Sequence, residues 1–168
     1  MDDIQISAEL HRRIADFRRD LHAHPELAFG EERTAGAVAS ALARLGIEVH
    51  RGLAKTGVVG RLTMGNGQGP AIGLRADMDA LPLDELNEFS HRSQHAGRMH
   101  ACGHDGHTAM LLGAAEALAA RRGQGPDGIV YFIFQPAEEH EGGGRVMVEE
   151  GLFTRFPMRQ VFGLHNWP

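Results

Sequence analysis

The sequence predicts an α/β fold, in which a mixed β-sheet is sandwiched by helices. Helical and strand-like patterns alternate along the chain, and this alternation is typical of the class. The run from Ile129 to Phe134 is continuously apolar, as in a strand of a sheet covered on both faces. The chain has 168 residues, 42% of them hydrophobic, so a single domain can bury a substantial core.

The first half of the chain predicts two helices followed by strands. Apolar residues at helical spacing predict a helix over residues 9–21, which ends before Pro25. An alanine-rich stretch predicts a second helix over residues 31–45, with Gly46 after its end. Short apolar or alternating runs predict three strands, at residues 47–50, 58–63 and 71–75. A glycine-rich turn separates the last two, which are therefore expected to form a hairpin.

The second half predicts a similar alternation after a polar, histidine-rich loop at residues 87–103. A small-residue helix is expected first, then the apolar strand, a short helix after a glycine run, and a final strand. Their expected ranges are 108–121, 129–134, 146–152 and 160–164.

Composition excludes several classes of protein. The net charge is −5 and the basic residues are scattered, so neither a nucleic-acid surface nor a polybasic membrane surface is indicated. A single cysteine excludes an internal disulfide framework. The acidic segment Met1–Gln5 has no signal-peptide pattern and no run approaches a membrane span, so a cytoplasmic location is expected.

Polar side chains with metal-binding or acid–base chemistry follow three of the predicted strands directly. Asp77 and Asp79, the Glu138–Glu139 pair, and His165 occupy these positions. If the strands run parallel, their carboxyl ends meet at one edge of the sheet, where α/β proteins bind ligands.

Cys102 and His104 lie just ahead of the predicted helix, separated by a glycine that permits a tight turn. Zinc accepts thiolate and imidazole ligands, whereas the alternative is a small buried cysteine beside a surface histidine. Asp105 is a candidate helix cap, and His107 a candidate outer-shell group or substrate donor.

The adjacent carboxylates Glu138 and Glu139 suit a hydrolytic metal site, in which one binds the ion and the other transfers a proton. The alternative is a solvated acidic turn, which the nearby Glu141 favours. Asp79 is a candidate to orient a ligand histidine or to bridge metals, or else a turn residue.

Five segments in this order resemble the amidohydrolase branch of the aminoacylase–carboxypeptidase metallopeptidases, which includes hippurate hydrolases and N-acyl-amino-acid amidohydrolases. The resemblance covers nearly the whole chain and implies a three-layer α/β/α sandwich with a mixed, mostly parallel sheet, as in zinc exopeptidases. The segments are residues 20–27, 74–82, 100–107, 135–139 and 163–165.

The resemblance also implies a site and a reaction. Cys102, His104, Glu139 and His165 would be ligands of two divalent ions, of zinc, manganese, cobalt or nickel. Glu138 would be the general acid/base and Asp79 a supporting carboxylate. The implied reaction is hydrolysis of the amide bond in small N-acyl or N-aroyl amino acids.

Members of this family continue beyond the equivalent of His165. They add a lid domain, through which full-length relatives can form homodimers, and a returning segment with a further histidine ligand. Residues 1–168 are therefore expected to be the N-terminal part of the catalytic domain, with a truncated sheet and impaired activity. The alternative is a non-catalytic metal-binding fragment or a partner-dependent module.

Overall fold

The computed structural model describes residues 6–166, so the segment Met1–Gln5 lies outside the described residues. The predicted helices and strands occur in the predicted order, with boundaries within a few residues of the expected ones, but a further short helix, Leu152–Arg155, was not predicted. The elements are α1 (Ala8–Ala23), α2 (Glu32–Arg44), β1 (Glu48–Leu53), β2 (Gly57–Met64), β3 (Ala71–Asp77), α3 (His104–Ala119), β4 (Gly128–Gln135), α4 (Gly143–Glu149), α5 (Leu152–Arg155) and β5 (Gln160–Gly163).

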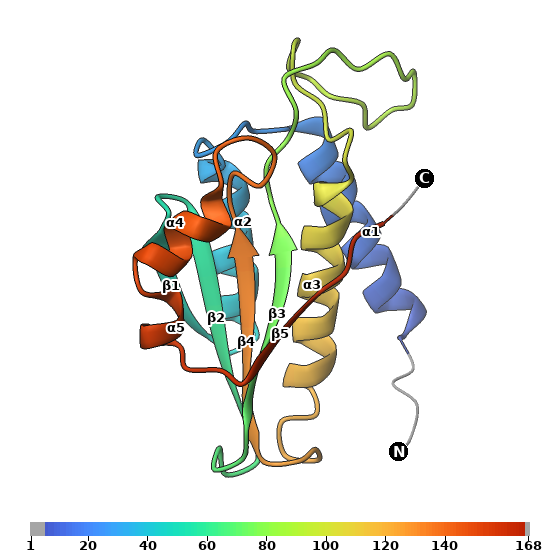
Figure 1. Cartoon of the computed structure of the whole chain (residues 1–168). Helices are drawn as coiled ribbons and strands as arrows, with labels where there is room; N and C mark the ends of the chain where they lie inside the picture. The colour runs from blue at the N-terminus through green and yellow to red at the C-terminus, as the bar shows by residue number, and fades with distance from the viewer. Residues whose placement is uncertain (1–5, 167–168) are drawn as a thin grey trace.

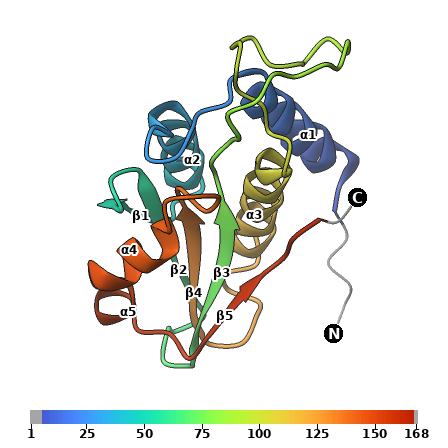
Figure 2. The ribbon, with the colours of Figure 1, turned by 45° about the horizontal axis from the view of Figure 1, so that its top comes forward.

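The strands form one sheet in the order β1-β2-β4-β3-β5, and Figure 2 shows them side by side. β2 is antiparallel to both β1 and β4, whereas β3 is parallel to both β4 and β5. The sheet is therefore mixed, as predicted. Among the described residues, parallel and antiparallel pairs are equal in number.

The predicted hairpin between residues 58–63 and 71–75 is wrong, because β4 lies between these two strands. Phe134 of β4 pairs with a residue of β2 on one side and with a residue of β3 on the other. The connection after β2 passes the start of β4, where Ile129 donates its N–H to the carbonyl of Pro70. An apolar strand covered on both faces buries most surface at the centre of the sheet, and this outweighs the short connection.

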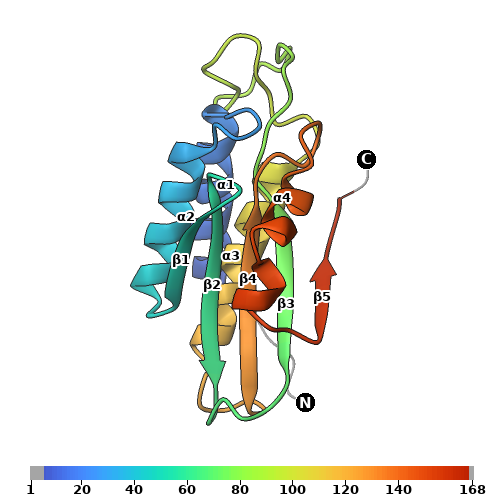
Figure 3. The same cartoon turned by 60° about the vertical axis from the view of Figure 1, so that its left-hand side comes forward.

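Helices cover both faces of the sheet, which makes three layers (Figure 3). The larger core joins α1, α2 and α3 to one face, and the smaller core joins α4 and α5 to the other. Fully buried side chains of the larger core include Val38, Leu42, Phe132 and Phe134. Between residues 6 and 166, no helix combines the length and the apolar character that a membrane span requires.

The parallel strands β3, β4 and β5 end at the same edge of the sheet. The loop between β3 and α3 rises beyond this edge, as does the loop between β4 and α4 (Figure 1). The candidate side chains of both loops are thereby placed near one another, as expected from the sequence.

Candidate metal centre

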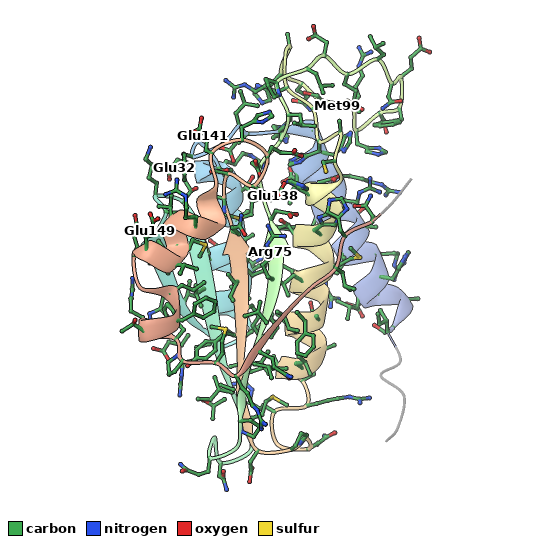
Figure 4. The ribbon with its side chains drawn as sticks, viewed as in Figure 1. Glu32, Arg75, Met99, Glu138, Glu141 and Glu149 are labelled. Atoms are coloured by element: carbon green, nitrogen blue, oxygen red, sulfur yellow. The ribbon has the colours of Figure 1, made fainter. Side chains whose placement is uncertain are left out.

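Three segments that are distant in the sequence bring their polar side chains together above the ends of β3 and β4. Cys102, His104 and His165 offer ligand atoms that all lie within 4.8 Å of one another. The same holds for His104, Glu138 and Glu139, so His104 belongs to both groups. Figure 4 shows Glu138 at this edge of the sheet, above Arg75 of β3. The structure thus places close together the side chains that were predicted from the sequence as metal ligands or as the general acid/base.

Gly103 sets the direction of the Cys102–His104 pair. Its φ of +85° lies in the left-handed region, which an L side chain rarely adopts. A Cβ here would also come within 2.6 Å of the Asn166 side chain. Helix α3 begins immediately afterwards at His104, four residues before the predicted start at Thr108, so His104 lies in the first turn of the helix rather than ahead of it.

Asp79 orients His104. Its Oδ1 lies 3.2 Å from Nδ1 of His104, while its Oδ2 accepts the backbone N–H of Glu139 at 3.1 Å. Burial alone would raise the pKa of Asp79, but these hydrogen bonds outweigh it and hold the pKa below its usual value. A carboxylate on Nδ1 keeps the proton on that nitrogen and turns Nε2 toward the cluster.

His165 presents the same ring nitrogen. Its Nδ1 donates to the backbone carbonyl of Asn166 at 2.6 Å, and its Nε2 lies 3.4 Å from Sγ of Cys102. The side chain of His165 is exposed, so this geometry depends on how its segment is held.

A chain of buried polar groups holds that segment. The backbone N–H of Asn166 donates to Nε2 of His107 at 3.1 Å, and Nδ1 of His107 donates to Asp77 at 2.6 Å. The other oxygen of Asp77 lies 2.8 Å from the guanidinium of Arg75. Oδ1 of Asp77 is therefore engaged by His107, whereas Oδ2 lies beside the Arg75 guanidinium without a hydrogen-bond partner within residues 6–166. Asp77, His104 and His107 form a third group whose ligand atoms lie within 4.8 Å of one another.

The cluster fits a divalent cation. Nε2 of His104 and Oε1 of Glu139 lie 3.6 Å apart, and both are buried without a hydrogen-bond partner among the described residues. Burial and the neighbouring carboxylates of Glu139, Asp77 and Glu138 raise the pKa of the Cys102 thiol to about 12. A cation would satisfy the two orphaned atoms and stabilise the thiolate, which is the ligand form of cysteine.

A second buried network surrounds His22, next to the metal cluster. Nδ1 of His22 lies 2.9 Å from Asp105, and Nε2 lies 3.0 Å from Glu85 in the long loop. The expectation that Asp105 caps α3 is wrong: its Oδ2 faces His22 and accepts from Arg18, because it lies inside the helix rather than before it. Burial lowers the pKa of the adjacent His100 to about 4, so that ring is neutral.

This network makes stability depend on pH. The hydrogen bond with Asp105 raises the pKa of His22 above 6.5, despite the opposing effect of burial, and Glu85 adds to the rise. The stabilisation is complete below pH 6.5 and is lost as the pH rises through the higher folded-state pKa. His22→Gln should therefore cost on the order of 1 kcal/mol more of unfolding free energy at pH 6 than at pH 9.

Denaturant unfolding of both proteins across this pH range measures the difference. His11→Gln, an exposed position on the same helix, is the matched control and should show no such trend. An equal cost of His22→Gln at both pH values would contradict the prediction.

Two residues of the site were not predicted from the sequence. Glu31 is fully buried and accepts the N–H of Ala137, next to Glu138. Asn166 contacts His107 through both its backbone and its side chain. No spacing or motif distinguishes Glu31 from the acidic residues around it, whereas the position of Asn166 beside a candidate ligand was a weak signal.

Known proteins with this arrangement include metallohydrolases. The sequence profile of peptidase family M20/M25/M40 matches residues 73–168. A hippurate hydrolase of Campylobacter jejuni is 48% identical over 160 residues, which are 95% of this chain and 41% of that protein. An N-acyl-L-amino acid amidohydrolase of Geobacillus stearothermophilus is 45% identical over 161 residues, which are 95% of this chain and 42% of that protein.

Among solved structures, the YXEP protein of Bacillus subtilis, a dinuclear metal-binding peptidase, superposes with a TM-score of 0.90 at 42% identity. The match covers 97% of this chain and 45% of that one. The chain thus spans about two fifths of the length of the curated relatives that it matches.

Proposed function

The chain belongs to peptidase family M20/M25/M40, and we propose that it carries the metal site of an enzyme that hydrolyses the amide bond of N-acyl or N-aroyl amino acids. The observation that carries the proposal is the convergence of the side chains of Cys102, His104, Glu138, Glu139 and His165. Two of their buried ligand atoms, on His104 and Glu139, have no hydrogen-bond partner in the described part of the chain. The names of the relatives, a hippurate hydrolase and an N-acyl-amino-acid amidohydrolase, support the substrate class.

We propose that Cys102, His104, Glu139 and His165 hold two divalent ions, as the dinuclear relative suggests. The mixture of one thiolate, two imidazoles and one carboxylate suits zinc, cobalt or nickel, and it also accommodates manganese. Bound ions supply Lewis-acid chemistry at the scissile carbonyl and acidify water.

Glu138 is the proposed proton carrier. Its side chain is 40% exposed, so both water and substrate can reach it, and its Oε2 lies 3.9 Å from Nε2 of His104. In this position Glu138 can take a proton from the attacking water and deliver it to the leaving amide nitrogen.

Asp79 supports both sides of the site. One carboxylate oxygen of Asp79 binds Nδ1 of His104 and thereby leaves Nε2 free to bind a metal ion. The other oxygen accepts the backbone N–H of Glu139 and thereby fixes the backbone from which the Glu139 side chain extends. We assign Asp79 a positioning role rather than a place among the ligands.

We further propose that residues 1–168 form the N-terminal part of a metallopeptidase catalytic domain. The relatives match 95% of this chain while it spans about two fifths of their length, which supports a larger parent architecture.

The test combines a titration with Co²⁺ and an assay of N-benzoylglycine hydrolysis. Both use the full-length protein, of which residues 1–168 are the proposed N-terminal part. We expect Co²⁺ binding to produce a thiolate charge-transfer band in the near ultraviolet, which Cys102→Ser removes. Hydrolysis should stop when a chelator removes the metal and return when the metal is restored. Binding without the thiolate band, or a metal-loaded protein that cleaves no N-acyl amino acid, would contradict the proposal.

A further inference from the structure

We propose that Glu31 is a positioning residue, which holds the loop of Glu138 and Glu139 in the conformation that directs both carboxylates at the metal cluster. The inference rests on the proposed function of that cluster. Glu31 lies far from this loop in the sequence and at the opposite end of the chain from β5. No motif in the sequence marked it.

Glu31 is an unusual side chain for its location. It is fully buried, with a relative exposure of 0%, just before α2. Its Oε2 accepts the hydroxyl of Thr56 at 2.6 Å, and its Oε1 accepts the backbone N–H of Ala137 at 2.9 Å. Burial raises the pKa of Glu31, although these two hydrogen bonds oppose the rise. A buried carboxyl group carries a desolvation cost, so its hydrogen bonds to specific partners indicate a role beyond filling space.

The partner of Glu31 is a strained turn. Ala137 has a φ of +53°, in the left-handed region that favours glycine, and it immediately precedes Glu138. Its carbonyl accepts the N–H of Gly143 at 2.9 Å, where an added Cβ would lie 1.9 Å from the carbonyl of Pro136. The kink at Ala137 is therefore held by its N–H and by its carbonyl, and both contacts come from outside the loop 136–139.

Asp79 holds the same loop two residues later, through the N–H of Glu139. Two buried carboxylates thus fix alternate backbone amides of the segment, Glu31 at Ala137 and Asp79 at Glu139. Asp79 also touches His104, whereas within residues 6–166 Glu31 makes no hydrogen bond or ion pair with any proposed ligand. The structure therefore assigns Glu31 an influence on the metal site that passes through the backbone of the loop.

The test compares Co²⁺ affinity in four variants, followed by the thiolate charge-transfer band. Glu31→Ala should weaken Co²⁺ binding by roughly 10-fold or more, as loss of outer-shell partners commonly does. Glu31→Gln should stay close to wild type, because its amide can accept from Ala137 and donate to the Thr56 hydroxyl. Adding Ala137→Gly to Glu31→Ala should restore most of the affinity, since glycine adopts the left-handed conformation without strain.

Val38→Ala is the control for a merely structural role. It removes buried methyl groups from α2 and destabilises the protein, but it should leave Co²⁺ affinity unchanged. If Glu31→Ala does not fold, Thr56→Val replaces it, because it removes one of the two partners of Glu31 and should weaken affinity in the same direction.

Amide hydrogen exchange at Glu139 separates this inference from the proposed function. Exchange should accelerate in the Glu31 or Thr56 variant and remain slow in Val38→Ala, whether or not metal is bound. A wild-type protein that binds no Co²⁺ would contradict the proposed function, while the exchange comparison still decides the role of Glu31. Wild-type Co²⁺ affinity in Glu31→Ala, equal losses in Val38→Ala, or no rescue by Ala137→Gly would overturn the inference.

Discussion

Glu138→Gln should lower kcat for hydrolysis of N-benzoylglycine by about 1000-fold in the natural protein, because glutamine cannot take up or deliver the proton. The amide has nearly the same shape as the carboxylate. The backbone contact of this loop with Asp79 is independent of the side chain at position 138. Metal affinity should therefore change little, and the loss should appear in kcat rather than in metal content.

Glu141→Gln is the matched control, since Glu141 is an exposed carboxylate of the same loop. It removes the same charge and should leave kcat near wild type. The two measurements are steady-state kinetics and bound metal per protein. Equal loss of metal and activity in Glu138→Gln would indicate a ligand role for this residue, and full activity would show that another group carries the proton.

His104→Ala should abolish metal binding in practice, with affinity reduced by more than about 100-fold, the upper end of the loss caused by outer-shell changes alone. His104 is fully buried and is the one side chain shared by the cysteine group and the glutamate group within residues 6–166. Burial lowers the pKa of His104, but the neighbouring carboxylates outweigh burial and raise it. Removing the His104 imidazole also leaves the buried carboxylate of Asp79 without this partner.

His140→Ala provides the comparison, because His140 is exposed and directly follows Glu139. Both variants are titrated with Zn²⁺ by calorimetry, after circular dichroism has established that they fold. A folded His104→Ala protein that binds Zn²⁺ as wild type does would remove His104 from the centre of the site.

The order of the secondary structure followed from local patterns, because each helix or strand carries its own periodicity. The position of β4 did not follow, since β2 and β3 are separated by a short turn that looks like a hairpin. Pairing depends on how much apolar surface the central position buries, and Phe132 and Phe134 supply that surface from a distant part of the chain. Local turn signals contain no information on such a competition.

The candidate site, like the fold, could be predicted from the sequence only in part. Cys102, His104, Glu138 and Glu139 were visible because chemistry-bearing residues stood at strand or helix ends in recognisable spacings. The residues that position these side chains could not be predicted from the sequence, because Glu31 acts through the backbone N–H of Ala137. A hydrogen bond donated by a backbone N–H does not depend on the side chain of the donating residue, so it leaves no residue pattern at that position.

The central position of β4 has a consequence for the order in which the sheet assembles. β2 and β3 are not paired with each other, so neither gains its inner neighbour until residues 128–135 are available. During synthesis on the ribosome, the edges of β2 and β3 that pair with β4 therefore remain unpaired while α3 is made. Such long-range pairing is slow and leaves apolar edges exposed to other chains. We therefore expect this stretch of synthesis to be the period of greatest dependence on chaperones.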